Sequence, residues 1–305
     1  MPKAQRQAKS RSRSKAKKSP SKEGKSKKAA ASKVRRGAGY LHGYTADEQQ
    51  RLYHQASFLA DDVHDRLPYR RCRNLLEVGC GTGAQTELLL RHFPALHVTG
   101  VDRNAENLAR AAAHLKRCPG TKSRFALQQA AAETLPFAMD EFDGAFLCWI
   151  LEHVAEPART LAEVRRVLRA GSPVVCTEVM NATFFLDPYS PDTLRYWRRF
   201  NDTQLDLGGD PFVGAKLGNL LLRNGFVDIH TEVKTFHLDN RRPGERTEFL
   251  AYWSLLLLSG APALERAGKV SAETVRGMQA ELQRVARDPD AVFWYSFVQA
   301  RARVP

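Results

Sequence analysis

A glycine-rich turn between two apolar segments is the feature that most restricts the fold of this chain. Residues 75–90 read LLEVGCGTGAQTELLL, in which Gly79, Gly81 and Gly83 separate a short apolar run from a helix-like run. A buried strand, a glycine turn and a helix in this order are typical of one unit of a parallel sheet. Glycines at such a turn let another molecule approach the backbone closely, because no Cβ atoms stand in the way. We therefore expect an α/β protein with a ligand at this turn.

Strand-like and helix-like segments alternate through the residues that follow. After the strand at 74–78, apolar runs at 96–102, 123–130, 142–150 and 173–179 predict four more strands, with helix-like segments between most of them. Strands connected by helices form right-handed crossovers, which produce a parallel, doubly wound sheet.

The C-terminal third departs from this rhythm. An alternating run at 227–239 and a strand-like run at 291–302 enclose a helical stretch at about 244–287. Two late strands with helices inserted between them predict an antiparallel pair at one edge of the sheet.

Basic residues are concentrated at the N-terminus. Residues 1–37 contain 15 Lys or Arg and one acid, Glu23, which leaves 32 basic and 32 acidic side chains in residues 38–305. Because no Leu, Ile, Phe, Trp or Tyr precedes Tyr40, this segment has almost nothing to bury against the entropy of ordering. We predict a disordered Lys/Arg/Ser-rich tail at 1–37 and a neutral folded domain at 38–305. The tail is interpreted as an electrostatic arm for nucleic acid or another polyanion, as a solubilising extension or as a localisation signal.

Signal-peptide, membrane-span and cysteine patterns indicate where in the cell the protein is expected. The tail is Lys-rich and has no apolar h-region, so neither a transit peptide nor a secretory signal is expected. The most apolar run, 255–264, is far shorter than the roughly 20 residues of a membrane span. The five cysteines are odd in number and show no C-x-x-C spacing, which argues against a disulfide framework or a zinc site. We predict no metal, no membrane contact and a cytoplasmic location, or a nuclear one if the source is eukaryotic.

The glycine turn is compatible with two unrelated cofactors. Gly79, Gly81 and Gly83 form G-x-G-x-G, and with Ala84 they also fit the dinucleotide fingerprint G-x-G-x-x-G/A. Asp102 ends the second predicted strand, where a carboxylate can accept hydrogen bonds from ribose hydroxyls. A dinucleotide and an activated methyl donor both satisfy this pattern.

Glu77 and a series of motifs favour the methyl donor. Glu77 lies two residues before Gly79, where it would place negative charge beside a pyrophosphate but suits a donor with a sulfonium and an ammonium group. The stretch AAAETLPFAMDEFDGAFLCWILEHV resembles the middle of the UbiE-like class I S-adenosylmethionine (SAM) methyltransferases, and LEVGCGTG, VTGVD, LPF, FDGAF and LEH occur in family order within residues 70–235. This resemblance implies a Rossmann-like, doubly wound, seven-stranded sheet, mostly parallel with an antiparallel C-terminal strand. It also implies methyl transfer from SAM.

The resemblance assigns roles at the donor site. The glycines would face the amino-acid part and ribose, Asp102 the ribose hydroxyls, and Cys148 the floor under the sulfonium. Because Ala131 replaces an acid that is common in the family, the adenine amino group would depend on backbone or on Glu133. The complete predicted donor set is Glu77, Gly79, Cys80, Gly81, Gly83, Asp102, Arg103, Ala132, Glu133 and Cys148.

The acceptor side is predicted from position in the sheet. A sulfonium methyl is already activated, so the protein mainly positions a nucleophile and needs a general base only if that nucleophile is protonated. His153 and Glu178 lie at the C-terminal ends of the fourth and fifth strands and are the candidate catalytic residues, although His153 could instead orient the loop. Segment 181–212 is predicted to form a substrate cap. The candidate substrate contacts are Trp149, Phe184, Phe185, Tyr189 and Trp197.

Several functional interpretations stay open. An amphipathic segment at about 45–68 is expected to form a lid helix over the donor, with Tyr53 as a candidate contact. Aromatic cap residues and a neutral domain favour a small organic acceptor, with O-, N-, S- and C-methylation undecided. The alternatives are a methyltransferase for nucleic acid or a nucleic-acid-associated protein recruited by the tail, a non-catalytic nucleic-acid-binding protein, and a dinucleotide oxidoreductase.

Overall fold

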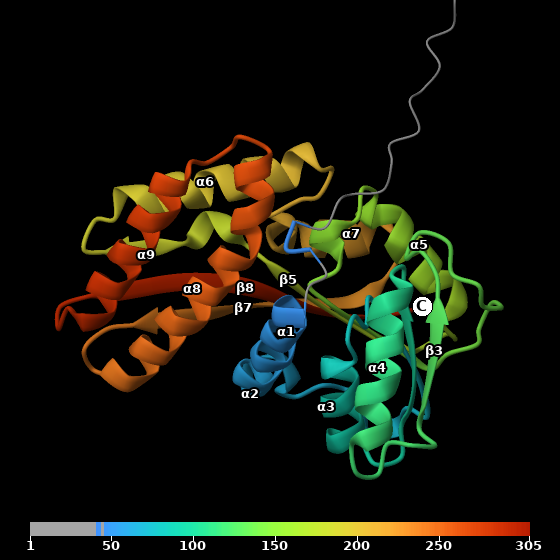
Figure 1. Cartoon of the computed structure of the whole chain (residues 1–305). Helices are drawn as coiled ribbons and strands as arrows, with labels where there is room; N and C mark the ends of the chain where they lie inside the picture. The colour runs from blue at the N-terminus through green and yellow to red at the C-terminus, as the bar shows by residue number, and fades with distance from the viewer. Residues whose placement is uncertain (1–40, 44–45) are drawn as a thin grey trace, which may run out of the picture. The chain divides into compact units, whose positions relative to one another are not determined.

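The computed structural model describes residues 41–43 and 46–305 (Figure 1). The tail predicted at 1–37 lies outside the described residues. The strands are β1 Asn74–Val78, β2 His97–Asp102, β3 Phe125–Gln129, β4 Gly144–Cys148, β5 Pro173–Val179, β6 Phe185–Asp187, β7 Val227–Leu238 and β8 Val292–Arg303. The α-helices are α1 Ala46–Phe58, α2 Ala60–His64, α3 Ala84–His92, α4 Ala105–Arg117, α5 Pro157–Val167, α6 Pro191–Asp206, α7 Leu217–Arg223, α8 Pro243–Arg266 and α9 Ala272–Arg287.

One mixed sheet organises the described part of the chain. Its order is β3-β2-β1-β4-β5-β8-β6, and β7 also pairs with β8. Strands β1 to β5 are parallel, whereas β8 is antiparallel to β5, β6 and β7. This arrangement confirms the predicted mostly parallel, doubly wound sheet with antiparallel C-terminal strands. Strand β6 is an addition that the sequence did not reveal, inside the segment predicted as a cap.

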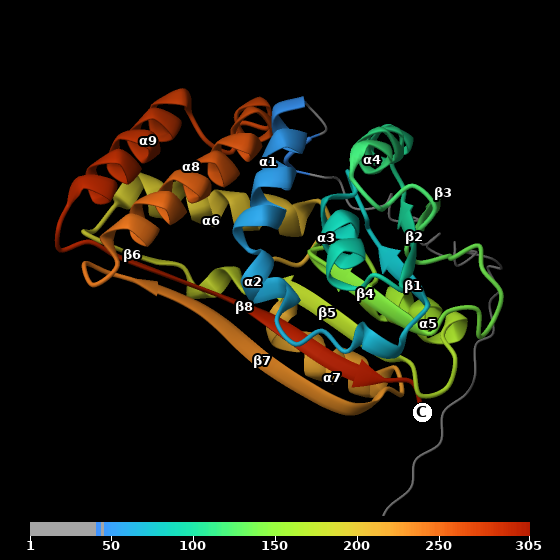
Figure 2. The ribbon, with the colours of Figure 1, turned by 90° about the horizontal axis from the view of Figure 1, so that it is seen from below.

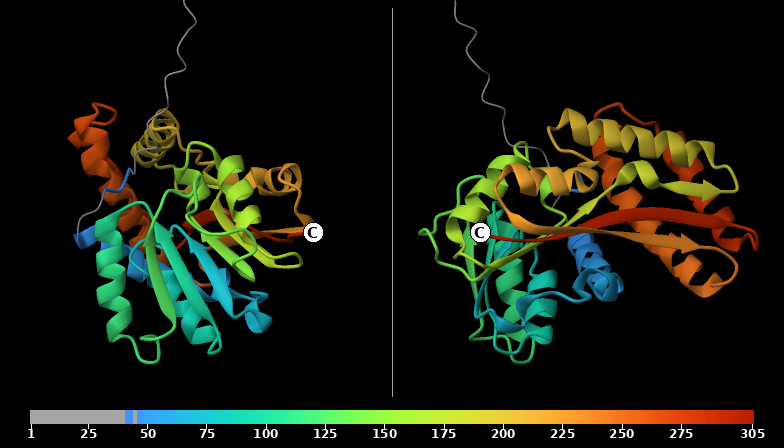
Figure 3. Two further views of the ribbon diagram at one scale, coloured as in Figure 1. Left: turned by 90° about the vertical axis from the view of Figure 1, so that its right-hand side faces the viewer. Right: turned by 180° about the vertical axis from the view of Figure 1, so that it is seen from behind.

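Helices cover both faces of the sheet because successive strand residues point to opposite sides. Leu75 of β1 is buried on one face with residues of α2 and α3, and Leu76 is buried on the other with residues of α5 and α7. Figures 1 and 3 accordingly show α5 and α7 across the sheet from α1 and α3. Asn104 caps α4, since its Oδ1 accepts from the amides of Glu106 (2.8 Å) and Asn107 (3.0 Å).

Helices α6, α8 and α9 form a separate group over the extended β6–β8–β7 part of the sheet (Figure 2). The predicted stretch at 244–287 is thus two helices, and the segment at 45–68 is also broken, into α1 and α2. The Glu281 carboxylate of α9 accepts from the amides of Asp192 (3.1 Å) and Thr193 (2.7 Å), so it caps the first turn of α6. Among residues 41–43 and 46–305, no helix combines the length and apolarity that crossing a membrane requires.

Candidate functional site

The glycine turn is shaped by backbone geometry that only glycine tolerates well. Gly79, Gly81 and Gly83 have φ angles of +76°, +51° and +81°. A Cβ atom on Gly79 would lie 2.8 Å from the Ile150 side chain, so this glycine is also required by packing. The amides of Gly79 and Cys80 donate to the Val101 carbonyl at 2.8 and 3.0 Å, which attaches the turn to the end of β2.

Asp102 connects the glycine turn to the segment between β2 and α4. One carboxylate oxygen accepts from the Gly81 amide at 3.0 Å, and the other accepts from the Asn104 amide at 2.8 Å. Burial raises the pKa of this carboxyl group, and the two amide bonds oppose that effect. Each oxygen keeps a further lone pair for a ligand, so Asp102 can order the turn and still contact a bound ribose.

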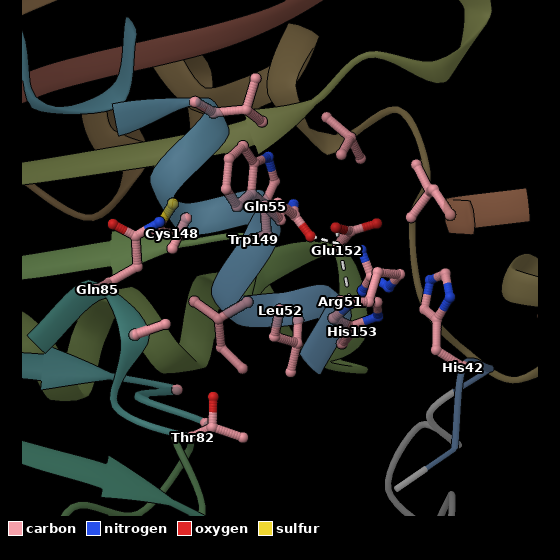
Figure 4. A pocket seen from close by; sticks show the side chains of 18 of the residues that line it. His42, Arg51, Leu52, Gln55, Thr82, Gln85, Cys148, Trp149, Glu152 and His153 are labelled. Carbon is pink, nitrogen blue, oxygen red and sulfur yellow. Dashed lines mark hydrogen bonds and ion pairs between the residues drawn. The ribbon is translucent and has the colours of Figure 1, made fainter. Parts of the chain in front are cut away.

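A pocket opens at this edge of the sheet, the carboxyl end of the parallel strands (Figure 4). It extends from the glycine turn past the ends of β2 and β4 to residues of α1, α6, α8, β7 and β8. Of the predicted site residues, the pocket brings together Gly79, Cys80, Gly81, Asp102, Arg103, Ala132, Glu133, Cys148, Trp149, His153 and Trp197. It is not lined by Glu77, Gly83, Glu178, Phe184, Phe185 or Tyr189.

Glu77 lies behind the glycine turn rather than in the pocket. Its Oε2 accepts from the Thr86 hydroxyl of α3 at 2.6 Å, and burial raises the pKa of its carboxyl group to about 8. Gly83 is the N-cap position of α3. Both residues therefore shape the turn in this structure.

Glu178 is buried and bonded entirely to backbone. Its carboxylate accepts from the amides of Ile150 (3.0 Å), Leu151 (2.7 Å) and Glu152 (3.2 Å). Burial raises the pKa of Glu178, as does the nearby Glu152 carboxyl, while the amide bonds lower it. Glu178, a candidate catalytic residue from the sequence, thus directs its oxygens into the turn that follows β4 and does not line the pocket.

That turn holds Trp149 in an uncommon conformation. Trp149 has a φ angle of +52°, its amide donates to the Thr177 carbonyl at 2.9 Å, and its ring lies edge-on to Phe297. A bulky residue at positive φ is strained and persists only where its surroundings fix it. Here Thr177 and Glu178 at the end of β5 fix the turn, which places Trp149 at the pocket wall.

His153 and Glu152 meet in the same turn. His153 Nε2 lies 3.6 Å from Glu152 Oε1, and Gln204 of α6 donates to Glu152 Oε2 at 2.7 Å. Burial lowers the pKa of His153, so its imidazole is neutral near pH 7 and can accept a proton. Figure 4 shows Glu152 and His153 next to Arg51, with His42 nearby. His42 is hydrogen-bonded to Ser259, and burial lowers its pKa as well.

Helix α1 forms one side of the pocket. Arg51 pairs with Glu48 through two 2.7 Å hydrogen bonds and donates to Gln55 at 2.6 Å. Tyr53, the predicted contact of this helix, does not line the pocket, but its hydroxyl donates to the Thr82 carbonyl in the glycine turn at 2.9 Å. No sequence signal pointed to His42, Arg51 or Gln55, since an amphipathic pattern does not tell which polar residues will cover a site.

The end of the pocket away from the glycines is aromatic. Tyr295 donates its hydroxyl to Asn181 Oδ1 at 2.9 Å, so its ring edge is held in place. The sequence segments FLAYW and FWYSF contain much of this wall, and their aromatic density was the signal that could have revealed it. The ring-bearing residues of this aromatic wall are Trp149, Trp197, Phe200, Phe236, Phe249, Tyr252, Trp253, Tyr295 and Phe297.

Three predicted substrate contacts lie elsewhere. Phe184 is buried in the core and stacks on Trp253, with ring centroids 5.3 Å apart. Phe185 and Tyr189 are 54% and 72% exposed and lie outside the pocket. Phe184 directly precedes β6 and is buried, whereas Phe185 lies on the exposed face of that strand, opposite to the buried Leu186.

Comparison with known proteins identifies the family. A model described as a methyltransferase domain matches residues 76–176. The O-methyltransferase cnsE of Penicillium expansum is 32% identical over 212 residues, which are 67% of this chain and 70% of that protein. The chain belongs to the methyltransferase family.

This methyltransferase also resembles demethylmenaquinone methyltransferase of Symbiobacterium thermophilum, with 35% identity over 111 residues. That match covers 36% of this chain and 44% of the relative, so the chain spans less than half of its length. Among solved structures, YcgJ of Bacillus subtilis is similar, with a TM-score of 0.51, 16% identity and coverage of 82% of this chain and 99% of that one. The shared feature is the fold.

The methyltransferase uses S-adenosylmethionine as its methyl donor. The glycine end of the pocket fits such a molecule, because Gly79 and Gly81 have no side chains and the Asp102 carboxylate lines the same space. Thr82 lines this end too, and its buried hydroxyl has no hydrogen-bond partner within the described part of the chain. Sugar hydroxyls and a charged amino-acid end are groups that such a lining can satisfy.

Proposed function

We propose that this methyltransferase transfers the methyl group of SAM to a hydroxyl oxygen of a small, flat, apolar molecule. The observation that carries the proposal is the continuity of one pocket, which runs from Gly79 and Asp102 to Tyr252 and Phe297. The O-methyltransferase of Penicillium expansum supports oxygen as the accepting atom. A cytoplasmic location and a polyanion contact through residues 1–37 stay predictions from the sequence.

The donor would occupy the glycine end. Asp102 would accept hydrogen bonds from the ribose hydroxyls, Arg103 and the Ala132 amide would border the adenine, and Cys148 would lie below the sulfonium. Burial raises the pKa of the Cys148 thiol well above its usual value, so this thiol stays protonated and does not compete for the methyl group. Glu77 would act indirectly, by holding Thr86 and therefore the start of α3.

The aromatic wall would bind the acceptor. Ring faces suit a planar apolar molecule, because offset and edge-on contacts add to the burial of apolar area. The arginines at the pocket are Arg51 and Arg103, and Arg51 is paired with the Glu48 carboxylate. With so few positive charges at the pocket, an uncharged acceptor is favoured over a phosphorylated or nucleic-acid acceptor.

His153 would act as general base. As the acceptor oxygen forms its bond to the methyl carbon, the carbon–sulfur bond breaks and its electron pair stays on sulfur. The hydroxyl proton passes to the His153 imidazole, whose new positive charge is stabilised by the Glu152 carboxyl 3.6 Å away. Placing the acceptor oxygen in line with the methyl group supplies most of the remaining rate acceleration.

The test supplies tritiated SAM together with separated small-molecule, RNA and protein pools from cells. We expect label in the small-molecule pool, in a product that carries a methyl ether. Trp149→Ala should raise the acceptor KM while calorimetry shows SAM affinity close to that of the wild type, because Trp149 belongs to the aromatic wall.

Trp294→Ala is the matched control, since Trp294 is also an aromatic residue near the sheet but lies outside the pocket. Equal loss of activity in both variants would contradict the assignment of the wall to the acceptor. Label that enters RNA or protein instead of the small-molecule pool would replace the proposed acceptor class.

A further inference from the structure

A second group of reactive side chains lies on the outer surface, between α3 and α4. His114 Nε2 is 2.8 Å from Glu87 Oε2 and 3.6 Å from Cys118 Sγ. Donor atoms of all three residues lie within 4.8 Å of one another, and all three residues are half-buried. Glu87 and His114 line a second hollow, which adjoins the pocket described above at Ala56 and Ala84.

The local structure explains why these residues converge. His114 lies in the last turn of α4 and Cys118 is the C-cap residue four positions later, so both side chains are on one face of the helix. Glu87 comes from the first turn of α3, which packs beside α4. The cluster therefore joins two helices whose positions are fixed by the central sheet.

The spacing suits a tetrahedral metal ion. With Zn–S and Zn–N bonds of about 2.3 and 2.0 Å, sulfur and nitrogen ligands of a tetrahedral zinc are about 3.5 Å apart. The observed separation of 3.6 Å between Cys118 Sγ and His114 Nε2 matches this edge. Glu87 Oε2 and His114 Nε2 are hydrogen-bond partners 2.8 Å apart and would separate to the roughly 3.3 Å of an oxygen–nitrogen edge when zinc binds. The negative end of α4 also attracts a cation.

Some charged groups near the cluster oppose a bound cation and others favour it. Arg91 pairs with the other oxygen of Glu87 and is exposed, and Arg117 lines the same hollow. Burial and the Glu87 carboxylate raise the pKa of the Cys118 thiol, so it carries its proton when no metal is present. A zinc ion would displace that proton, and a thiolate together with a carboxylate would balance its two positive charges.

We propose that Glu87, His114 and Cys118 form a zinc(II)-binding site outside the methyl-transfer pocket. The Cys118 thiol releases its proton to solvent as the sulfur–zinc bond forms. The His114 proton moves from Nε2 to Nδ1, which breaks the hydrogen bond to Glu87, and Glu87 Oε2 and His114 Nε2 then each supply an electron pair. Water occupies the fourth position. Thiolate and imidazole ligands select zinc over magnesium, which prefers oxygen ligands.

The site is connected to α1 through one aromatic residue. The Tyr53 ring lies on the His114 imidazole, with centroids 4.4 Å apart, and its hydroxyl bonds to Thr82 in the glycine turn. Zinc bound at His114 would fix the position of this ring and so join α1, α3 and α4. Binding to the folded state alone also raises the Tm.

The experiment is a zinc titration of the whole protein in competition with a chromophoric zinc indicator, followed by cobalt(II) spectroscopy. We expect one zinc bound, an increase in Tm with zinc but not with magnesium, and a cobalt–thiolate absorption band. Cys118→Ser and His114→Gln should each weaken zinc binding by at least about tenfold. His230→Gln is the control, because His230 is exposed on β7 and away from the cluster.

Circular dichroism and the Tm measured without metal show whether each variant is folded. Zinc affinity in Cys118→Ser and His114→Gln that equals that of the wild type would overturn the proposal. So would a wild-type protein that binds neither zinc nor cobalt at this stoichiometry.

Discussion

One buried carboxylate determines the position of the turn that carries Trp149 and His153. Glu178→Gln keeps the volume of the side chain but replaces one accepting oxygen with a donor, so at least one backbone amide loses its partner. We expect the free energy of unfolding to fall by about 1–3 kcal/mol. Turnover should fall more than SAM affinity, which denaturant unfolding, calorimetry and steady-state kinetics can separate.

Glu245→Gln provides the control for this prediction, since Glu245 is an exposed residue in the first turn of α8. Unchanged stability in Glu178→Gln would mean that the amides of the turn find other partners. A loss of SAM binding as large as the loss of turnover would place Glu178 in the donor site instead.

Asp102 is expected to control donor affinity. Asp102→Ala removes the acceptor for the Gly81 and Asn104 amides and also leaves ribose hydroxyls unpaired. We expect SAM and its demethylated product to bind more weakly by about 2–4 kcal/mol, measured by calorimetry. Asp102→Asn should lose less, because it keeps one accepting oxygen. Tight binding of NAD by the wild type would contradict the donor assignment.

The pH dependence of turnover follows from His153. Burial disfavours the charged form and holds the pKa of His153 below its usual value, so the neutral base is present above that lowered pKa. We expect kcat at saturating substrates to be level near pH 7 and to fall only as the pH drops through this lowered pKa. His153→Asn should be slow throughout and lack this acidic limb. An unchanged limb in His153→Asn would assign the titration to another group.

At the scale of elements, the N-terminus of α6 depends on a residue from α9. Glu281→Ala removes the acceptor for the Asp192 and Thr193 amides, and we expect a loss of about 0.5–2 kcal/mol in stability, as for a deleted helix cap. Because α6 carries Trp197 and Phe200 into the pocket, the acceptor KM should rise while SAM affinity is retained. Gln283→Ala, exposed on α9, is the control. A Tm equal to that of the wild type would show that the cap contributes little.

Local sequence patterns predicted the parallel half of the sheet and much less of the rest. Strands β1, β2 and β5 follow the expected ranges closely, because short apolar runs and glycine turns are local signals. Strand β6 could not be foreseen, since its pairing partner Phe293 is far along the chain from Leu186. Contacts between residues far apart in the chain leave no local pattern, so the role of Glu178 could not be predicted either, because its amide partners follow another strand. The Cys118 cluster was hidden for the same reason, because its carboxylate comes from α3.

The uneven charge is a property of the whole chain. Residues 38–305 carry equal numbers of acidic and basic side chains, so we expect residues 1–37 to supply nearly all non-specific affinity for polyanions. A chain starting at Gly37 should retain methyl transfer to a small acceptor and lose binding to duplex DNA or RNA. Binding by the full chain should weaken as salt rises from about 50 to 200 mM. Undiminished binding by the shortened chain would reveal a basic surface on the folded part.

Strand β8 comes after every other strand in the chain, yet it completes the sheet. Strands β5 and β6 pair with successive stretches of it, and β7 pairs with nearly its whole length. During translation, β5 and β7 therefore leave the ribosome with unpaired amides and carbonyls and wait for residues 292–303. Tyr295 and Phe297 of the aromatic wall arrive with the same strand. The acceptor side of the pocket is thus the last part to form, and nascent chains expose strand edges that can aggregate until then.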